Sequence, residues 1–298
     1  MSKKYNKQHI VPETYLKHFS FNEDGKGIFV IDNHDEFRKE IQIRNSGDRI
    51  FWEKKFYNSV QFNKPTALEE LFGKSIESYY NGLITLIKED KEINDWDVKL
   101  KLINWMFTSI QRTAQKRFVL RKVLDIKIWK KKVYPDLKYP TGDNLDLDII
   151  AKEQHLKQFA DEETLQSNLE EFINFVMVRR WEIMKCPKNI YWITTDNPGF
   201  LLILNEDKVM ANPSWDYSKS DELFYPLSKD YGIHIFPYSK GDSPELNLTN
   251  TPILRTNTTQ GINRLFNRFS FASMHRLLIS PDKETFVELT KEINKIST

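Results

Sequence analysis

One segment of the chain reads Pro187-Lys-Asn-Ile-Tyr-Trp-Ile-Thr-Thr-Asp-Asn-Pro-Gly-Phe-Leu-Leu-Ile-Leu204, and there the hydrophobic pattern changes from a helical period to that of strands. We predict a buried strand over Ile190–Thr195, because branched and aromatic residues fill it. Asn197-Pro198-Gly199 is typical of a turn, so we expect Phe200–Leu204 to be the partner of that strand. The same pattern predicts two further strands, Glu222–Pro226 and Gly232–Phe236.

Upstream of this segment the sequence is helical. Thr66-Ala-Leu-Glu69 is a capping box, in which the Thr and Glu side chains satisfy each other's backbone donors, and it predicts a helix that ends near Lys88. Apolar residues at helical spacing predict three more helices, Asp97–Lys127, Leu147–Phe159 and Glu163–Met184. Pro and Gly residues predict a loop over 136–146.

The two ends of the chain complete the pattern. Gly27–Asp32 and Glu40–Arg44 predict a hairpin near the N-terminus, after a short helix that follows Pro12. Thr258–Asn267 and Pro281–Ile296 predict closing helices, and the pattern leaves Phe269–Met274 open between a strand and a continuation of the first of these helices.

Segregated strands and helices, rather than regular alternation, indicate an α+β fold. We expect a small N-terminal β region, a helical middle and a β-rich C-terminal part with closing helices, at 1–60, 61–186 and 187–298. These parts are expected to form a single compact domain over residues 1–298.

Composition narrows the class of protein. The chain has 298 residues, and its 13% aromatic content argues against disorder. Its 44 Lys and Arg residues nearly balance 42 Asp and Glu residues, which argues against chain-wide nucleic-acid binding but leaves a local basic patch open. Cys186 is the only cysteine, so no internal disulfide forms. We expect a cytoplasmic protein without membrane contact, because no signal peptide or apolar span is evident.

Polar residues at the end of the predicted strand Ile190–Thr195 form the first candidate site. A carboxylate at Asp196 is well placed to hold a divalent cation, with Asn197 beside it. The alternative is a turn in which Asp196 caps backbone donors or pairs with a buried arginine. His9 is a candidate general base or metal ligand, and the alternative is a histidine that only hydrogen-bonds within its loop.

The first two long predicted helices carry the second set of candidates. Glu69 and Glu77 can supply carboxylates to a metal site, although such residues more often face solvent or pair with Lys. Gln111, Arg112 and Arg117 can bind a phosphate group, because guanidinium groups fork onto phosphate oxygens. The alternatives are a solvated basic face, or internal pairs of Arg112 or Arg117 with Asp196 or Glu77.

Several motifs, in this order, resemble one protein family. They are Lys7-Gln8-His9-Ile10-Val11-Pro12, Glu53-Lys54-Lys55-Phe56-Tyr57, Leu68-Glu69, Ile76-Glu77, Gln111-Arg112-Thr113, Thr194-Thr195-Asp196-Asn197-Pro198, Phe224-Tyr225-Pro226 and Ile262-Asn263. The chain is therefore similar to the bacterial domain-of-unknown-function family 4238, over nearly its whole length. Ile10 replaces the usual Tyr, and Ala114 stands where a Pro is common. The resemblance implies no particular activity.

Two functions follow from these residues. The first is a metal-dependent phosphodiesterase or nuclease-like effector, in keeping with phage defence. His9 and Asp196 would be catalytic, Glu77 and Asp196 would ligate Mg²⁺ or Mn²⁺, and the substrate would be bound by Gln111, Arg112, Arg117 and Asn197.

The second is a non-catalytic module that binds nucleic acid or protein, in which the same polar residues form a structural network. In both cases we expect nucleic acid to contact the basic helix around Arg112–Lys132. We expect no nucleotide cofactor, because the chain has no glycine-rich phosphate loop or dinucleotide fingerprint. Close approach of His9, Glu77 and Asp196 would favour the enzyme, and scattered or paired side chains would favour the binding module.

Overall fold

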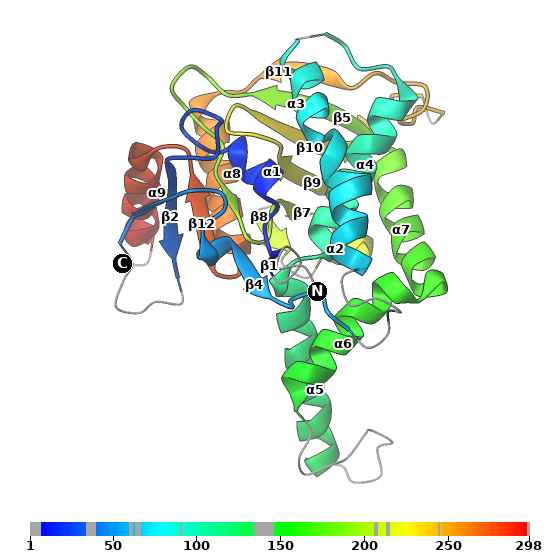
Figure 1. Ribbon diagram of the computed structural model, residues 1–298. Coiled ribbons are helices and arrows are strands. Elements are labelled where there is room, and N and C mark those ends of the chain that lie inside the picture. Colours follow the sequence, from blue (N-terminus) through cyan, green and yellow to red (C-terminus); the bar gives the residue numbers. More distant parts are fainter. Residues whose placement is uncertain are drawn as a thin grey trace.

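The fold is α+β, as expected (Figure 1). The computed structural model describes residues 7–33, 40–59, 62, 67–89, 91–133, 146–205, 208–212, 215–243 and 245–296. In this part of the chain, two larger sheets lie on either side of a helix near the C-terminus, and a group of helices covers the other side of the larger sheet (Figure 1).

The larger sheet has six strands in the order β11-β5-β10-β9-β7-β8. All neighbouring pairs are antiparallel except β11 and β5, which are parallel. Its strands are β5 (Arg179–Lys185), β7 (Phe200–Asn205), β8 (Lys208–Asn212), β9 (Glu222–Pro226), β10 (Tyr231–Pro237) and β11 (Leu254–Asn257).

The second sheet has the order β3-β2-β12-β6, and a short ribbon pairs β1 with β4. In this ribbon His9 lies directly opposite Trp52. The strands are β1 (Lys7–His9), β2 (Ile28–Asp32), β3 (Gln42–Arg44), β4 (Trp52–Lys54), β6 (Thr194–Thr195) and β12 (Leu277–Ser280).

Apart from the helices that cover the six-stranded sheet, the remaining long helices of the described chain lie in three places (Figure 1). α8 lies between the two larger sheets, α9 covers the outer face of the four-stranded sheet, and α5 projects from the body together with α6 (Figure 1). Their bounds are α1 (Glu13–Lys17), α2 (Ala67–Leu71), α3 (Tyr80–Lys88), α4 (Trp96–Gln111), α5 (Ala114–Val133), α6 (Leu147–Ala160), α7 (Glu162–Met177), α8 (Gln260–Ser273) and α9 (Lys283–Ile296). None of the helices in the described residues combines the length and apolar character that crossing a bilayer requires.

Several predicted elements are confirmed. The N-terminal hairpin forms from β2 and β3, β9 and β10 lie where strands were expected, and α8 continues through Phe269 to Ser273. The expected loop over 136–145 and the capping residue Thr66 lie outside the described residues.

Three predictions are wrong. The helix expected to reach Met184 ends at Met177, and Arg179–Lys185 is instead an inner strand of the six-stranded sheet. Tertiary pairing overrides helix propensity here, since β5 bonds to β10 on one side and β11 on the other. Of the strand expected over Ile190–Thr195, only Thr194–Thr195 forms, and it belongs to the four-stranded sheet, whereas Phe200 begins β7 in the other sheet. The turn at Asn197-Pro198-Gly199 therefore passes the chain between sheets and does not close a hairpin.

The third wrong prediction is a continuous helix over Asp97–Lys127, which is broken between Gln111 and Ala114. Side chains occupy the carbonyls that a continuing helix would use. The Thr113 hydroxyl donates to the Ile110 carbonyl at 3.2 Å, and His155 Nε2 lies 2.8 Å from the Gln111 carbonyl. The helix predicted to end at Lys88 is also irregular, with a π turn at Phe72–Ile76 and a 3₁₀ turn at Glu77–Tyr79. Such turns in helices are frequent at functional sites.

Candidate active site

A cluster of polar side chains gathers where these two helical irregularities meet the β1–β4 ribbon. It consists of His9, Tyr57, Glu69, Glu77 and Arg112, and we call it the His9–Arg112 cluster. His9 ends β1, Glu69 lies in α2, Glu77 opens the 3₁₀ turn, and Arg112 caps the C-terminal end of α4. Segments that are far apart in the sequence thus supply one group of ionisable side chains.

Arg112 is the centre of this cluster, and its side chain is only 2% exposed. Its Nη1 donates to Glu77 Oε1 at 2.8 Å, its Nη2 donates to the carbonyl of His9 at 3.0 Å, and its Nε donates to the Tyr57 hydroxyl at 3.0 Å. The guanidinium carbon also lies 4.4 Å from the ring centre of Phe72. A buried guanidinium needs such partners, because an uncompensated charge in the interior is costly.

The break in the helix and the turns before α3 explain how these groups meet. Arg112 is the C-cap of α4, where its N–H still bonds to the Thr108 carbonyl, and Glu77 sits at the start of a 3₁₀ turn rather than in a continuous helix. The Tyr57 hydroxyl also lies 3.4 Å from the Arg112 carbonyl, which closes the end of α4. The internal pair of Arg112 with Glu77 is one of the alternatives that the sequence left open.

Glu69 has the most unusual electrostatics in the cluster. Burial, helped by the nearby Glu77 carboxylate, raises the pKa of Glu69 to about 7 against the opposing effects of the Arg112 charge and the backbone N–H of His9. Its Oε2 is buried and has no hydrogen-bond partner. A carboxyl group with a pKa near neutrality can donate or accept a proton at physiological pH.

The pKa of His9 is shifted in the opposite direction, downward. Burial lowers its pKa from 6.5, although the carboxylates of Glu77 and Glu13 act against this change. Its Nε2 lies 4.0 Å from Glu13 Oε2, and its side chain keeps 21% of its exposed area, so it borders solvent. Burial also raises the pKa of Tyr57 to about 12, which keeps its hydroxyl protonated. At neutral pH the cluster therefore contains a neutral imidazole, that of His9, and a half-protonated carboxyl group, that of Glu69.

An open groove begins next to His9. Ile10, the next residue in the chain, and Trp52, the partner of His9 in the ribbon, line it together with the arginines Arg44, Arg49 and Arg276, and the cavity volume is about 650 Å³. Trp52 is the residue opposite His9 in the β1–β4 ribbon, so the two side chains lie on the same face. Three acidic residues, Asp32, Asp48 and Glu53, balance the charge of the arginines in the lining.

Gln111 and Arg117 lie behind the cluster. Gln111 is buried, and its carbonyl is held by His155 and Gln158. Arg117 Nη2 donates to the Phe56 carbonyl at 2.9 Å, and its guanidinium lies 3.9 Å from the centre of that ring. Burial lowers the pKa of His155 to about 3, so this histidine is neutral. These contacts bind the Gln111 backbone carbonyl and the Arg117 guanidinium inside the protein, and the role of both residues in substrate binding stays a prediction.

Asp196 and Asn197 lie in the turn directly after β6. Asp196 is buried, and its Oδ1 accepts hydrogen bonds from the backbone N–H groups of His275 and Arg276 at 3.2 and 3.1 Å. Asn197 Nδ2 donates to the Ser273 carbonyl at 2.8 Å. These bonds join the turn after β6 to the segment between α8 and β12. Burial raises the pKa of Asp196 to about 6.

The predicted metal site does not fit these positions. Among the described residues, which include His9, Glu77 and Asp196, no three His, Cys, Asp or Glu side chains are arranged to hold a metal ion. Glu77 is instead bound to Arg112 and Asp196 to backbone N–H groups. The described residues thus offer no ligand set for Mg²⁺ or Mn²⁺.

The first half of the predicted basic helix is largely paired. Arg121 contacts Asp125 and Asp148, and burial lowers the pKa of Lys116 to about 8 although Glu171 is nearby. Lys122 lies 4.4 Å from the ring centre of Phe118. The side chains at 128–132 lie outside the described residues. The described half therefore offers little free positive charge to nucleic acid.

The sequence did not identify Tyr57 or Trp52, and it gave Glu69 a capping role as its main explanation. Tyr57 belongs to the segment Glu53-Lys54-Lys55-Phe56-Tyr57, which carried the family resemblance, and this was the available signal. Nothing in the spacing of Glu69 indicates its burial, because that depends on how α2 packs against β1 and Arg112.

Comparison with known proteins places the chain in a family without supplying an activity. No curated protein and no solved structure matches it. The model of the family described as "Protein of unknown function (DUF4238)" matches residues 7–284. This match covers the His9–Arg112 cluster, both larger sheets and the turn at Asp196, and the chain therefore belongs to the DUF4238 family.

Proposed function

We propose that the chain is an acid–base enzyme that cleaves phosphodiester bonds of RNA at the His9–Arg112 cluster, without a metal ion in the chemical step. The observation that carries this proposal is the buried Glu69 carboxyl group, whose pKa is raised to about 7 and whose Oε2 has no partner, next to a histidine with a lowered pKa. Titratable groups whose pKa values are pushed apart by their surroundings are typical of acid–base pairs.

The roles follow from the protonation states. Neutral His9 takes the proton of the ribose 2′-hydroxyl as its oxygen attacks phosphorus. Protonated Glu69 donates its proton to the 5′-oxygen as the bond from phosphorus to that oxygen breaks, which leaves a cyclic phosphate and a 5′-hydroxyl. Arg112 acts as a positioning residue, because it bonds to the His9 carbonyl, and Glu77 compensates its charge.

RNA is favoured over DNA as the substrate for a chemical reason. The 2′-hydroxyl is an internal nucleophile, so the reaction needs no metal-bound water, whereas a phosphodiester of DNA lacks this group. The groove beside His9 suits such a chain, because Trp52 offers a ring for base stacking and Arg44 and Arg49 offer guanidinium groups for phosphates.

The test is cleavage of a labelled single-stranded RNA in the presence of EDTA, with the matching DNA as a second substrate. We expect the wild type to cut only the RNA. Glu69→Gln and His9→Gln should each lower the rate by about 100-fold or more, since general acid–base groups contribute on that order. Glu70→Gln, the same exchange at the next residue of α2, is the control and should retain the wild-type rate.

A second function has its own supporting observation. All three kinds of nitrogen in the Arg112 guanidinium bond to partners inside the protein, as in a structural network. In that case the chain is a binding module, RNA stays intact with the wild type, and Glu69→Gln changes only the stability. Cleavage that requires Mg²⁺ or Mn²⁺ would instead contradict the metal-free step.

A further inference from the structure

We propose that a basic groove at one end of the six-stranded sheet, distinct from the His9–Arg112 cluster, binds the phosphates and bases of a nucleotide or single-stranded nucleic acid. The groove is lined by Lys88, Lys185, Lys188, Arg255, Tyr191 and Tyr231, and we call it the Lys185 groove. It goes beyond the proposed cleavage reaction and does not depend on it.

Sheet pairing builds the groove. Lys185 at the end of β5 lies opposite Tyr231 at the start of β10 on one side and opposite Asn257 at the end of β11 on the other. The three side chains therefore form a row on one face of the sheet. Two hollows, of about 210 and 580 Å³, share Lys185 and Tyr231 and therefore lie next to each other.

The charge of the lining is strongly asymmetric. Four cationic side chains line the two hollows against one acidic residue, Asp230, although the whole chain is nearly balanced. Arg255 donates to the carbonyls of Ile87 and Leu86 near the end of α3, and Lys88 contacts Glu23. In the described part of the chain no salt bridge joins an acidic residue to Lys185 or Lys188, and only Asp230, at the edge of the same hollow, interacts electrostatically with Lys185. These two ammonium groups are therefore available to an anionic ligand.

Aromatic side chains lie between the cations. The ammonium group of Lys185 is 5.9 Å from the centre of the buried Tyr231 ring, and the half-buried Tyr191 lines the same hollow. Lysines beside an accessible aromatic ring suit nucleic acid, because the ammonium groups contact phosphates while a ring such as that of Tyr191 stacks on a base. An acidic peptide would use the charges but would gain little from the rings.

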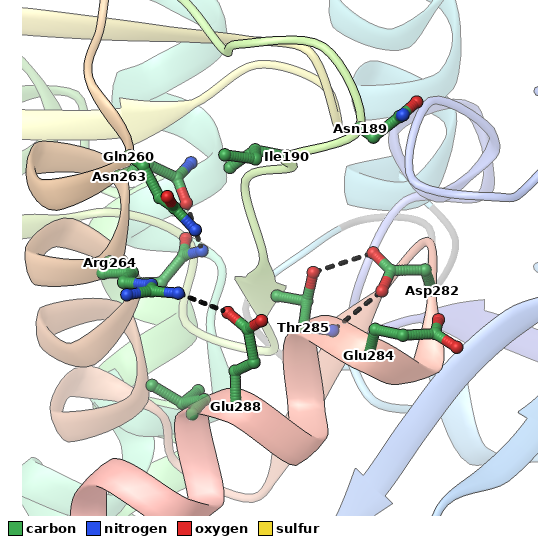
Figure 2. A pocket seen from close by; sticks show the side chains of 11 residues that line it. Asn189, Ile190, Gln260, Asn263, Arg264, Asp282, Glu284, Thr285 and Glu288 are labelled. Carbon is green, nitrogen blue, oxygen red and sulfur yellow. Dashed lines mark hydrogen bonds and ion pairs between the residues drawn. The ribbon is translucent and has the colours of Figure 1, made fainter.

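The pocket on the other side of the turn at 187–190 has the opposite charge. Asp282, Glu284 and Glu288 line it against a single cation, Arg264. Figure 2 shows that Arg264 is paired with Glu288 and that Asp282 is bonded to Thr285. In the same view the side chain of Asn189 points away from Arg264 and Glu288. An anionic ligand is therefore repelled on that side and attracted to the Lys185 groove.

The binding test uses the intact chain and fluorescein-labelled oligothymidylate, followed by fluorescence anisotropy. DNA lacks the 2′-hydroxyl, so binding is measured without cleavage, and failure of this inference is distinguishable from failure of the proposed RNA cleavage. We expect Lys185→Glu combined with Lys188→Glu to raise the dissociation constant by about tenfold or more, and the salt dependence to become shallower. Lys208→Glu combined with Lys240→Glu removes the same charge from exposed positions elsewhere and should change the dissociation constant less than about twofold.

Two additional arms identify the source of the phosphate and the role of the ring. Competition by a nucleoside monophosphate at concentrations where inorganic phosphate has no effect would indicate a free nucleotide, and competition only by unlabelled oligonucleotide would indicate a strand. Tyr191→Ala should weaken binding by about tenfold with an unchanged salt dependence, since stacking carries no charge. Absence of wild-type binding at low salt, or equal affinity of the Lys185→Glu/Lys188→Glu variant and the Lys208→Glu/Lys240→Glu control, would overturn the inference.

Discussion

At the scale of single residues, burial strengthens the electrostatic interactions among Arg112, Glu77 and Glu69. Arg112 is 2% exposed and Glu77 is 18% exposed, so their ion pair is shielded from solvent. Removal of one partner of a buried pair leaves the other charge uncompensated. Both charges act on the nearby Glu69 carboxyl group. Burial has the largest effect on the pKa of Glu69, and the charges of Arg112 and Glu77 have smaller effects.

Arg112→Met tests the buried ion pair. We expect this exchange to lower the free energy of unfolding by about 3–5 kcal/mol, because Glu77 and the His9 carbonyl lose their donor. Urea denaturation measures this loss. Adding Glu77→Gln to the same variant should recover part of it, and a loss below about 1 kcal/mol in the single variant would contradict the pairing.

Glu69 also makes a prediction about pH. Its folded-state pKa of about 7 lies above the ordinary 4.5, so folding favours the protonated form. The contribution of protonated Glu69 to the free energy of unfolding is therefore fully present below about pH 4.5. It is lost as the pH rises through about 7, and the loss amounts to up to about 3 kcal/mol. Glu69→Gln should remove this dependence and make the protein more stable than the wild type at about pH 8. Equal unfolding free energies of wild type and variant at about pH 5 and about pH 8 would contradict the raised pKa.

At the scale of elements, the sequence predicted regular segments well and their interruptions poorly. The strands β9 and β10 follow from their own residues, because alternation is a local signal. The end of α4 depends on His155 and Thr113 taking carbonyls from the helix, and β5 depends on its two neighbouring strands. Such long-range contacts have no counterpart in hydrophobic spacing, and they are also what forms the candidate site.

Gly199 tests the turn that passes the chain between the two sheets. Its φ is +81°, and a Cβ atom there would lie 2.7 Å from the Phe224 carbonyl oxygen. We therefore expect Gly199→Ala to lower the free energy of unfolding by about 2 kcal/mol. Gly82→Ala is the control with the opposite sign: it lies in α3 with open space around its Cβ position, and should stabilise by about 0.5–1 kcal/mol. Thermal melting of both variants checks the pair, and equal shifts would contradict this description of the turn.

At the scale of the whole molecule, the net charge is nearly zero, but positive and negative side chains are distributed unevenly over the surface. The described part of the basic run that was expected to contact nucleic acid is mostly paired, while the Lys185 groove combines Lys185 and Lys188 with cations from α3 and β11, which are far away in the sequence. The sequence could give the α+β class and the family resemblance, and it named His9, Glu77 and Arg112. It could not show that Asp196 is held by backbone N–H groups of the segment before β12, because that pairing is a property of the packed sheet.

The placement of basic surface makes one more prediction. Arg121→Glu combined with Lys122→Glu, in α5, should leave oligothymidylate affinity within about twofold of the wild type, because these charges are already compensated or isolated. Fluorescence anisotropy under the conditions used for the Lys185 groove measures this. A loss as large as that of Lys185→Glu/Lys188→Glu would restore α5 as the nucleic-acid interface.

The pH dependence of RNA cleavage in EDTA tests the central claim most directly. The rate should rise as His9 loses its proton below pH 6.5 and should fall as Glu69 ionises at about pH 7, so that the maximum lies between the two pKa values. A rate that keeps rising above about pH 8, or no cleavage of RNA by the folded wild type, would contradict the assignment of His9 as base and Glu69 as acid.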